Sequence, residues 1–253
     1  MKARVLTFNT LFRGRSRERL GVLARIIDRS DYDVVCLQEV ISPLNLAYLR
    51  RAARSFPHIA YASAFPVVRG GLVTLSRRPI VRRRYEAFAR KPPARPEWLL
   101  RKGALFTRVQ LPGGFLTVVN THLSANMDMH WTPSNAYTRA EEFELRELAA
   151  HIGRIDAAEP LAVMGDFNVP RDYHLFGEFA AAAGLKDALA GAMETTYNPD
   201  YAAIGPIDQM LIRPGMEATT QVVFKERVRL PGGAAAYLSD HYGIAATLIA
   251  PSA

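Results

Sequence analysis

The alternation of short apolar runs with amphipathic helical windows is the feature that most constrains how this chain folds. Residues 3–9 (ARVLTFN) and 33–40 (DVVCLQEV) are apolar and β-branched, which is typical of buried strands. Apolar residues recur at helical spacing between 20 and 27, from 145 to 152 and from 176 to 183. This mixture predicts two stacked β-sheets with helices outside. Further strands are predicted at 71–76, 104–111, 115–123, 161–167, 207–213, 219–228 and 236–250.

The composition is that of a globular protein: 253 residues, 49% hydrophobic and 22% charged. The Pro-rich stretch 90–96 is followed at once by more strands, so we expect a surface loop there and one domain over residues 1–253. A single cysteine, Cys36, excludes an internal disulfide and is predicted to lie in the core. The start of the chain has no signal-peptide pattern and no run is long enough to span a membrane, which predicts a cytoplasmic protein.

The basic charge is concentrated in one segment. Residues 77–102 hold ten Arg or Lys and two Glu, whereas the rest of the chain has 22 basic and 22 acidic residues. On charge alone, this segment is equally compatible with a solvated loop and with a surface for an anionic membrane or a nucleic acid.

Polar side chains follow most of the predicted core strands. Each one alone is a common turn-former. Together they would form a pocket of carboxylates, amides and two imidazoles. The carboxylates would repel one another unless a cation is present. These residues are Asn9, Glu39, Asn120, His122, Asp166, Asn168, Asp208, Asp240 and His241.

The donor atoms in this pocket indicate which ion it would hold. Carboxylates and amides without cysteine suit Mg²⁺ or Mn²⁺ better than zinc, and no HExxH spacing is present. No GxSxG elbow, P-loop or dinucleotide-binding glycine pattern occurs either. The pocket therefore favours metal-assisted hydrolysis of a phosphate ester, a reaction that depends mainly on positioning and charge neutralisation.

At these residues the sequence resembles the endonuclease/exonuclease/phosphatase superfamily. The resemblance spans residues 7 to 241 and implies a four-layer α/β sandwich with two stacked mixed β-sheets flanked by helices, and with the site at one edge. The matching motifs, in family order, are TFN, LQEV, TLSRRPI, NTHL, GDFN, IDQML and SDH.

The resemblance also implies a metal site. Glu39 would be the principal Mg²⁺ ligand, with Mn²⁺ as a possible substitute. Asn9 and Asp240 would reach the metal directly or through water.

The same resemblance implies catalytic roles. Asp166 would orient and help to deprotonate the attacking water, while Asn168 and His122 would bind non-bridging phosphate oxygens. His241 would face the scissile phosphate as base or charge stabiliser, and Asp208 would fix its tautomer. In-line attack on phosphorus is the implied mechanism.

Two local features refine these expectations. Neighbouring side chains in a strand face opposite sides, so Asp240 and His241 are predicted to serve different partners. In the deoxyribonuclease branch the histidine of the NTHL position is paired with an acid, but the stretch VVRGGLVTLS offers none. His122 is therefore expected to contact phosphate rather than act as a general acid.

The substrate remains open at this stage. The motifs RKGAL, NTHLSAN and LSDHYG are similar to those of the sphingomyelinase-like and bacterial phosphodiesterase branch. This similarity favours a phospholipid or a small phosphodiester as substrate. Nucleic acid is the alternative, and a catalytically silent member that only binds nucleic acid or membrane is a third. Trp131 and Tyr137 are candidates for substrate contact or for packing, and no protein partner is predicted.

Overall fold

The first β-sheet is built around a parallel pair of strands joined by a helix. The computed structural model describes residues 1–251, and in it β1 (Lys2–Asn9) and β2 (Val34–Gln38) pair in parallel on either side of α1 (Ser16–Asp28) in sequence. The six strands follow the order β11-β14-β1-β2-β4-β3, and all other pairings are antiparallel. The remaining elements of this half are α2 (Pro43–Ala52), β3 (His58–Ala64), β4 (Val67–Ser76), β11 (Glu217–Val223) and β14 (Gly243–Ile249).

The second sheet repeats this plan. Its parallel pair is β7 (Gly114–His122) and β8 (Leu161–Asp166), joined by α3 (Ala136–Ile152). The order is β5-β6-β7-β8-β10-β9, again with all other pairings antiparallel. The remaining elements here are β5 (Ile80–Ala87), β6 (Gly103–Leu111), α4 (His174–Ala182), β9 (Lys186–Asp187) and β10 (Asp208–Ile212). Three short elements lie outside both sheets, namely the 3-10 helix η1 (Pro96–Leu99), β12 (Val228–Arg229) and β13 (Ala235–Ala236).

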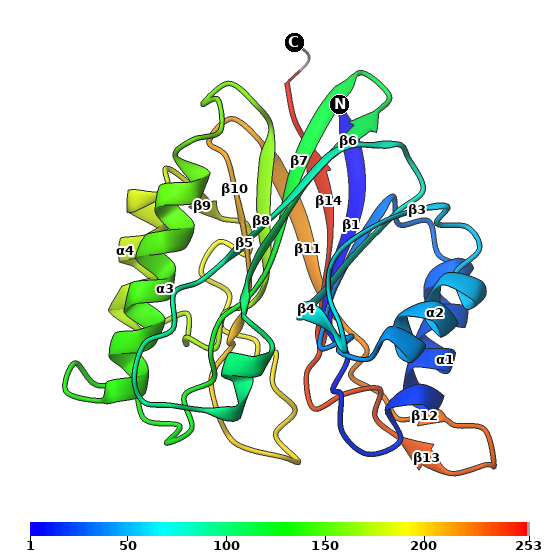
Figure 1. The fold of residues 1–253 in the computed structure, drawn as a ribbon. Coiled ribbons are helices and arrows are strands. Elements are labelled where there is room, and N and C mark those ends of the chain that lie inside the picture. The colour runs from blue at the N-terminus through cyan, green and yellow to red at the C-terminus, as the bar shows by residue number, and fades with distance from the viewer. Residues whose placement is uncertain (252–253) are drawn as a thin grey trace.

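Four layers and four hydrophobic clusters result, three of them large and one small (Ala60, Leu72 and Leu105). Figure 1 shows α1 and α2 covering one sheet and α3 and α4 covering the other. Side chains from the inner faces of both sheets, such as Val5 and Val118, form the central core. Leu23 and Phe176 belong to the outer cores beneath the helices. Because both faces of each sheet are covered, strands such as β2 are buried at every position and read as continuous apolar runs.

The predicted four-layer sandwich is therefore confirmed, with corrections to single elements. The strand expected at 236–250 begins only at Gly243, because the chain bends at Asp240 and His241 forms an isolated bridge with Tyr197. The basic segment 77–102 is not one loop, since β5 occupies its first half. Between residues 1 and 251, no helix is long and apolar enough to cross a membrane.

Candidate active site

The polar strand ends meet at one rim of the two sheets. Asn9, His122 and Asp166 are the last residues of β1, β7 and β8, and the carboxyl ends of parallel strands lie at the same edge. Asp208 is the first residue of the antiparallel β10, so it reaches this edge as well. The register pairs Asp166 with His122 on one side and with Asp208 on the other. Glu39 directly follows β2 and completes the rim.

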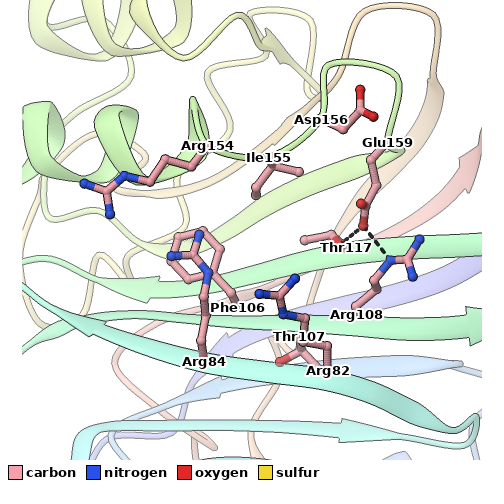
Figure 2. A pocket seen from close by; sticks show the side chains of 10 residues that line it. All are labelled: Arg82, Arg84, Phe106, Thr107, Arg108, Thr117, Arg154, Ile155, Asp156 and Glu159. Atoms are coloured by element: carbon pink, nitrogen blue, oxygen red, sulfur yellow. Dashed lines mark hydrogen bonds and ion pairs between the residues drawn. The ribbon is translucent and has the colours of Figure 1, made fainter.

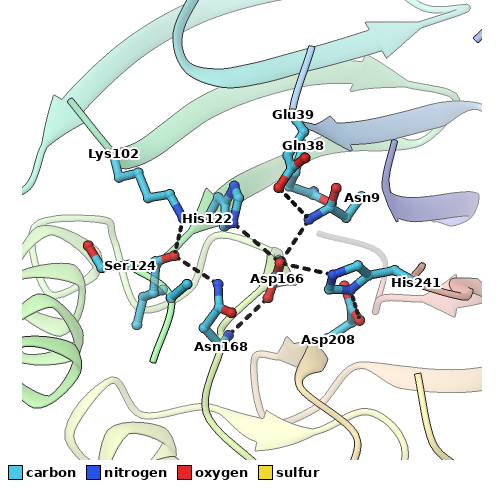
Figure 3. A network of polar contacts seen from close by, with 12 residues as sticks. Asn9, Gln38, Glu39, Lys102, His122, Ser124, Asp166, Asn168, Asp208 and His241 are labelled. Carbon is cyan, nitrogen blue, oxygen red and sulfur yellow. Dashed lines mark hydrogen bonds and ion pairs between the residues drawn. The ribbon is translucent and has the colours of Figure 1, made fainter. Parts of the chain in front are cut away.

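Asp166 is the centre of this cluster (Figure 3). Its Oδ2 accepts a hydrogen bond from Nδ2 of Asn9 at 2.9 Å and lies 3.3 Å from Nε2 of His122 and 3.6 Å from Nε2 of His241. Its Oδ1 accepts from the backbone N–H of Asn168 at 3.0 Å. Burial alone would raise the pKa of Asp166, but the charges of His241 and His122 outweigh burial and hold the pKa well below its usual range. An ionised carboxylate therefore lies between two imidazoles.

His241 and Asp208 form a buried hydrogen-bonded pair. Nδ1 of His241 donates to Oδ2 of Asp208 at 2.9 Å, which directs Nε2 toward Asp166. Burial alone would lower the pKa of His241, but the charges of Asp208 and Asp166 raise it to about 10. Asp240 and His241 have different hydrogen-bond partners, as predicted, namely Tyr197 and Asp208. The predicted reason is wrong, because both residues precede β14 and Oδ1 of Asp240 lies only 4.0 Å from Nε2 of His241.

Tyr197 also belongs to this corner of the site, although nothing in its local sequence indicates it. Its hydroxyl donates to Oδ2 of Asp240 at 3.3 Å, and its ring meets the ring of His241 edge-on, with centroids 4.9 Å apart. The backbone of Asp240 accepts from the N–H of Asn198 at 2.8 Å. The loop before β10 thus holds the segment before β14 in place.

The residues predicted to hold Mg²⁺ are only partly brought together. Oε1 of Glu39 lies 3.4 Å from Nδ2 of Asn9, and Oε2 accepts from the backbone N–H of Phe12 at 2.8 Å. Asp240 is joined to the cluster through His241. A second set, Asp166, Asp208 and His241, has one ligand atom each within 4.8 Å of the others.

The donor chemistry fits a divalent cation. Oδ1 of Asp208 is buried without a hydrogen-bond partner, and half-buried carboxylates of Glu39 and Asp240 face the same rim. Such a concentration of oxygen donors suits Mg²⁺ or Mn²⁺. Nδ1 of His241 is already bonded to Asp208, so the carboxylates are the better ligands of this group.

Asn120 does not join the rim, contrary to the sequence-based expectation. It is fully buried, accepts from Nε2 of Gln38 at 2.7 Å and donates from Nδ2 to the carbonyls of Leu37 and Val73, both at 3.1 Å. Asn120 comes from β7, whereas the other three residues come from β2 and β4. This amide therefore ties the two sheets together rather than contributing to the site.

The two aromatic candidates differ in their surroundings. Nε1 of Trp131 donates to the carbonyl of Asn168 at 3.0 Å, which fastens the loop before α3 to the site. Tyr137 lies in the first turn of α3 beneath the guanidinium of Arg95, at 5.0 Å from its ring centroid. Trp131 is thus placed beside a predicted phosphate contact, while Tyr137 packs against the loop that follows β5.

A basic groove lies away from this cluster, on the outer face of β5, β6 and β7 (Figure 2). Its volume is about 440 Å³. Arg82 lies directly opposite Arg108 in the β5–β6 register, an arrangement in which like charges repel. Thr117 in the groove precedes His122 by five positions on β7, or about 17 Å along an extended strand. The groove is lined by Arg82, Arg84, Phe106, Thr107, Arg108, Thr117, Arg154, Ile155, Asp156 and Glu159.

Solved structures share this architecture. Sphingomyelinase C from Streptomyces griseocarneus matches with 22% identity and a TM-score of 0.73, over 98% of this chain and 99% of that chain. A mutant of beta toxin from Staphylococcus aureus with bound magnesium ions matches with 16% identity and a TM-score of 0.78, over 97% and 99%. D. rerio TDP2 complexed with single strand DNA product matches with 18% identity and a TM-score of 0.76, over 98% and 99%. At these identities the likeness shows the fold.

The family follows from the sequence match. Comparison with curated proteins finds no match. The family model of the Endonuclease/Exonuclease/phosphatase family matches residues 6–241, which covers every residue of the cluster in Figure 3. The chain therefore belongs to the Endonuclease/Exonuclease/phosphatase family, whose members are metal-dependent hydrolases of phosphoric ester bonds.

Proposed function

We propose that this protein is a Mg²⁺-dependent phosphodiesterase that hydrolyses a phospholipid or a small phosphodiester by in-line attack of water. The observation that carries the proposal is the ionised carboxylate of Asp166 flanked by Nε2 of His122 at 3.3 Å and Nε2 of His241 at 3.6 Å. The carboxylate can accept a proton from water. The two imidazoles beside it can stabilise the charge that develops during phosphoryl transfer.

Each residue has a part in this proposal. Asp166, held by the amide of Asn9, orients the attacking water and draws its proton. His241, fixed by Asp208, faces the phosphate on one side, and His122 and Asn168 bind its non-bridging oxygens on the other.

Glu39, Asn9 and Asp240 would hold Mg²⁺, with Mn²⁺ as a substitute. The ion, when bound, supplies positive charge to the phosphate oxygens. Glu39 and Asp240 are half-buried, so their carboxylates can face both the ion and the entering substrate.

Support for a lipid or small phosphodiester comes from the similar structure of a sphingomyelinase C, and support for Mg²⁺ comes from the beta toxin structure with bound magnesium ions. Trp131 is proposed as a substrate contact because its indole is fastened to the backbone of Asn168. The predicted cytoplasmic location and the reading of residues 1–253 as one domain remain proposals.

Nucleic acid is the second candidate substrate, and the basic groove favours it. Among the acidic residues at positions 1–251, none pairs with Arg82 or Arg154, which leaves their guanidinium groups available to phosphates. Only a long polyanion or a membrane could contact both this groove and the catalytic rim, because the two are about 17 Å apart along β7. A TDP2 structure with single strand DNA product shows that this fold accommodates such a ligand.

A substrate panel tests the proposal. Bis(p-nitrophenyl) phosphate, sphingomyelin, glycerophosphodiesters, inositol phosphates, plasmid DNA and abasic duplex are incubated with and without Mg²⁺, with His241→Ala as the blank. We expect Mg²⁺-dependent turnover that is largest for sphingomyelin or a glycerophosphodiester, and a loss on the order of 10²–10³ in rate in His241→Ala. Preferential cleavage of DNA would favour the nuclease alternative. If wild type and Asp166→Ala show the same absence of turnover, the silent binding member is the correct reading.

A further inference from the structure

Lys102 is a buried lysine at the edge of the catalytic cluster that no role described so far explains. It lies immediately before β6, and its side chain is 4% exposed. The basic segment 77–102 therefore does not form one charged surface, because its last residue points inward, toward the rim (Figure 3). A lysine is rarely buried without a specific partner for its charge.

All three donors of this ammonium group have acceptors. Nζ lies 2.9 Å from Nε2 of His122, donates to the carbonyl of Leu123 at 2.8 Å and pairs with Oε1 of Glu97 at 2.5 Å. The other oxygen of Glu97, Oε2, accepts from the backbone N–H of Ala125 at 3.1 Å. A lysine has three N–H donors and no acceptor, so these three contacts satisfy its hydrogen-bonding capacity. The ammonium is consequently fixed in one position.

The contact with His122 holds that ring in place. Nζ of Lys102 lies 2.9 Å from Nε2 of His122, and the same ring nitrogen lies 3.3 Å from Oδ2 of Asp166. Nε2 of His122 is therefore placed between a buried ammonium group and the central carboxylate.

The contact with Leu123 reaches a second residue of the site. The same carbonyl that accepts from Lys102 also accepts from Nδ2 of Asn168 at 3.0 Å. One ammonium group is thus bonded to His122 directly and to Asn168 through a shared acceptor. These are the two residues proposed to bind the non-bridging phosphate oxygens.

We infer that Lys102, held by Glu97, is a positioning residue that holds the His122 ring in place and orients the amide of Asn168. The kinetic consequence rests on the proposed function, whereas the contact of Lys102 with the His122 ring does not.

Nitrogen-15 NMR of the His122 ring tests the structural part. The signals are assigned by comparison with His122→Gln. We expect the Nε2 signal of His122 to shift in Lys102→Met, because the ammonium group that contacts this nitrogen is lost. An unchanged Nε2 signal in Lys102→Met would overturn the inference.

Kinetics with bis(p-nitrophenyl) phosphate and Mg²⁺ test the positioning role. Lys102→Met should lower kcat on the order of 10–100-fold with little change in KM, as loss of a group that orients active side chains does. The matched control is Lys225→Met, which breaks an exposed Lys–Glu pair (Nζ to Oε1 of Glu194, 2.8 Å) and should leave kcat unchanged. Equal kcat values for the two variants would contradict the positioning role.

Two further arrangements keep the test decisive. If Lys102→Met does not fold, the double variant Lys102→Gln/Glu97→Gln removes both charges and keeps two hydrogen-bonding side chains, and the same two measurements apply. If wild type hydrolyses no phosphodiester, the proposed function fails, and the NMR result alone decides the role of Lys102.

Discussion

Two residues of the site have backbone conformations that non-glycine residues seldom adopt. Glu39 and Asn168 have φ angles of 62° and 52°. Left-handed conformations of this kind cost on the order of 1–3 kcal/mol each and persist where surrounding contacts hold them. The N–H of Phe12 bonds to the Glu39 carboxylate and Nδ2 of Asn168 bonds to the carbonyl of Leu123, so contacts within the site stabilise both turns. The strained turns aim both side chains at the rim.

A second residue-scale feature is a buried acid without a partner. Both carboxylate oxygens of Glu141 are buried and lack hydrogen bonds. Burial, and then the neighbouring charge of Glu144, raise the pKa of Glu141 from 4.5 to about 9. The folded state therefore holds a proton that the unfolded state releases, and the stability due to this group is lost as pH rises from about 4.5 to about 9.

Glu141→Gln should remove this loss. Since Gln stays neutral, we expect the variant to be more stable than wild type at mildly alkaline pH, with a Tm increase of about 2–4 °C for each kcal/mol gained. Thermal unfolding across the pH range measures it, with the exposed Glu226→Gln as control. A variant whose Tm falls with pH as steeply as that of wild type would show that Glu141 is ionised in the folded protein.

Some of these residues were recognisable in the sequence and others were not. Asp166, Asp208 and His241 follow or precede apolar runs, so their place at a strand end is a local property. Lys102 and Tyr197 reach the site only because loops fold back against distant strands. Their contacts depend on tertiary structure, which a local pattern of charge or hydrophobicity does not contain.

At the scale of elements, β7 and β8 approach unusually closely where they reach the site. Gly165 in β8 has a φ of +149°, and a Cβ there would lie 1.9 Å from the carbonyl oxygen of Thr121 in β7. No side chain fits without moving one strand. The next residue along β8 is Asp166, so the spacing of the strands sets the position of the central carboxylate.

Gly165→Ala should therefore harm both stability and activity. Overpacking costs about 1–3 kcal/mol, and a shift of Asp166 should lower kcat by an order of magnitude or more. The control is Gly177→Ala in α4, where a Cβ meets nothing within 4 Å and should stabilise by about 0.5–1 kcal/mol. Chemical denaturation and turnover measure both variants; a Gly165→Ala protein with the stability and kcat of wild type would refute the packing argument.

The elements themselves were predicted unevenly. Strands buried on both faces, such as β1, β2 and β8, have apolar runs that reveal them. The edge strand β5 (IVRRRYEA) exposes its arginines on the groove and on solvent, so it resembles a loop in sequence. β3 and α2 were likewise missed, because partial exposure weakens the hydrophobic pattern of both.

At the scale of the whole molecule, the site belongs to both sheets. Asn9 and Glu39 come from the first sheet, and His122, Asp166 and Asp208 from the second. A cation bound between them would bind only the folded protein and would hold the two halves together. Stability should then depend on the free metal concentration by mass action.

Mg²⁺ at about 100 times its Kd should raise the free energy of unfolding by about 2.7 kcal/mol, and EDTA should reverse the effect. Differential scanning calorimetry of wild type and of Glu39→Gln measures this, with Glu226→Gln as the control. The increase should be present in wild type and the control and absent or much smaller in Glu39→Gln. An equal increase in the free energy of unfolding in Glu39→Gln would indicate that the metal binds at Asp166 and Asp208 instead.

The position of β14 has a consequence for biosynthesis. This strand lies between β1 and β11, and His241 immediately precedes it. During translation β14, the partner of β1 on that side, leaves the ribosome more than 200 residues after β1. A nascent chain shorter than residue 249 therefore has an incomplete first sheet, and its His241 is not held in place. The proposed hydrolytic activity should therefore arise only once β14 has been released.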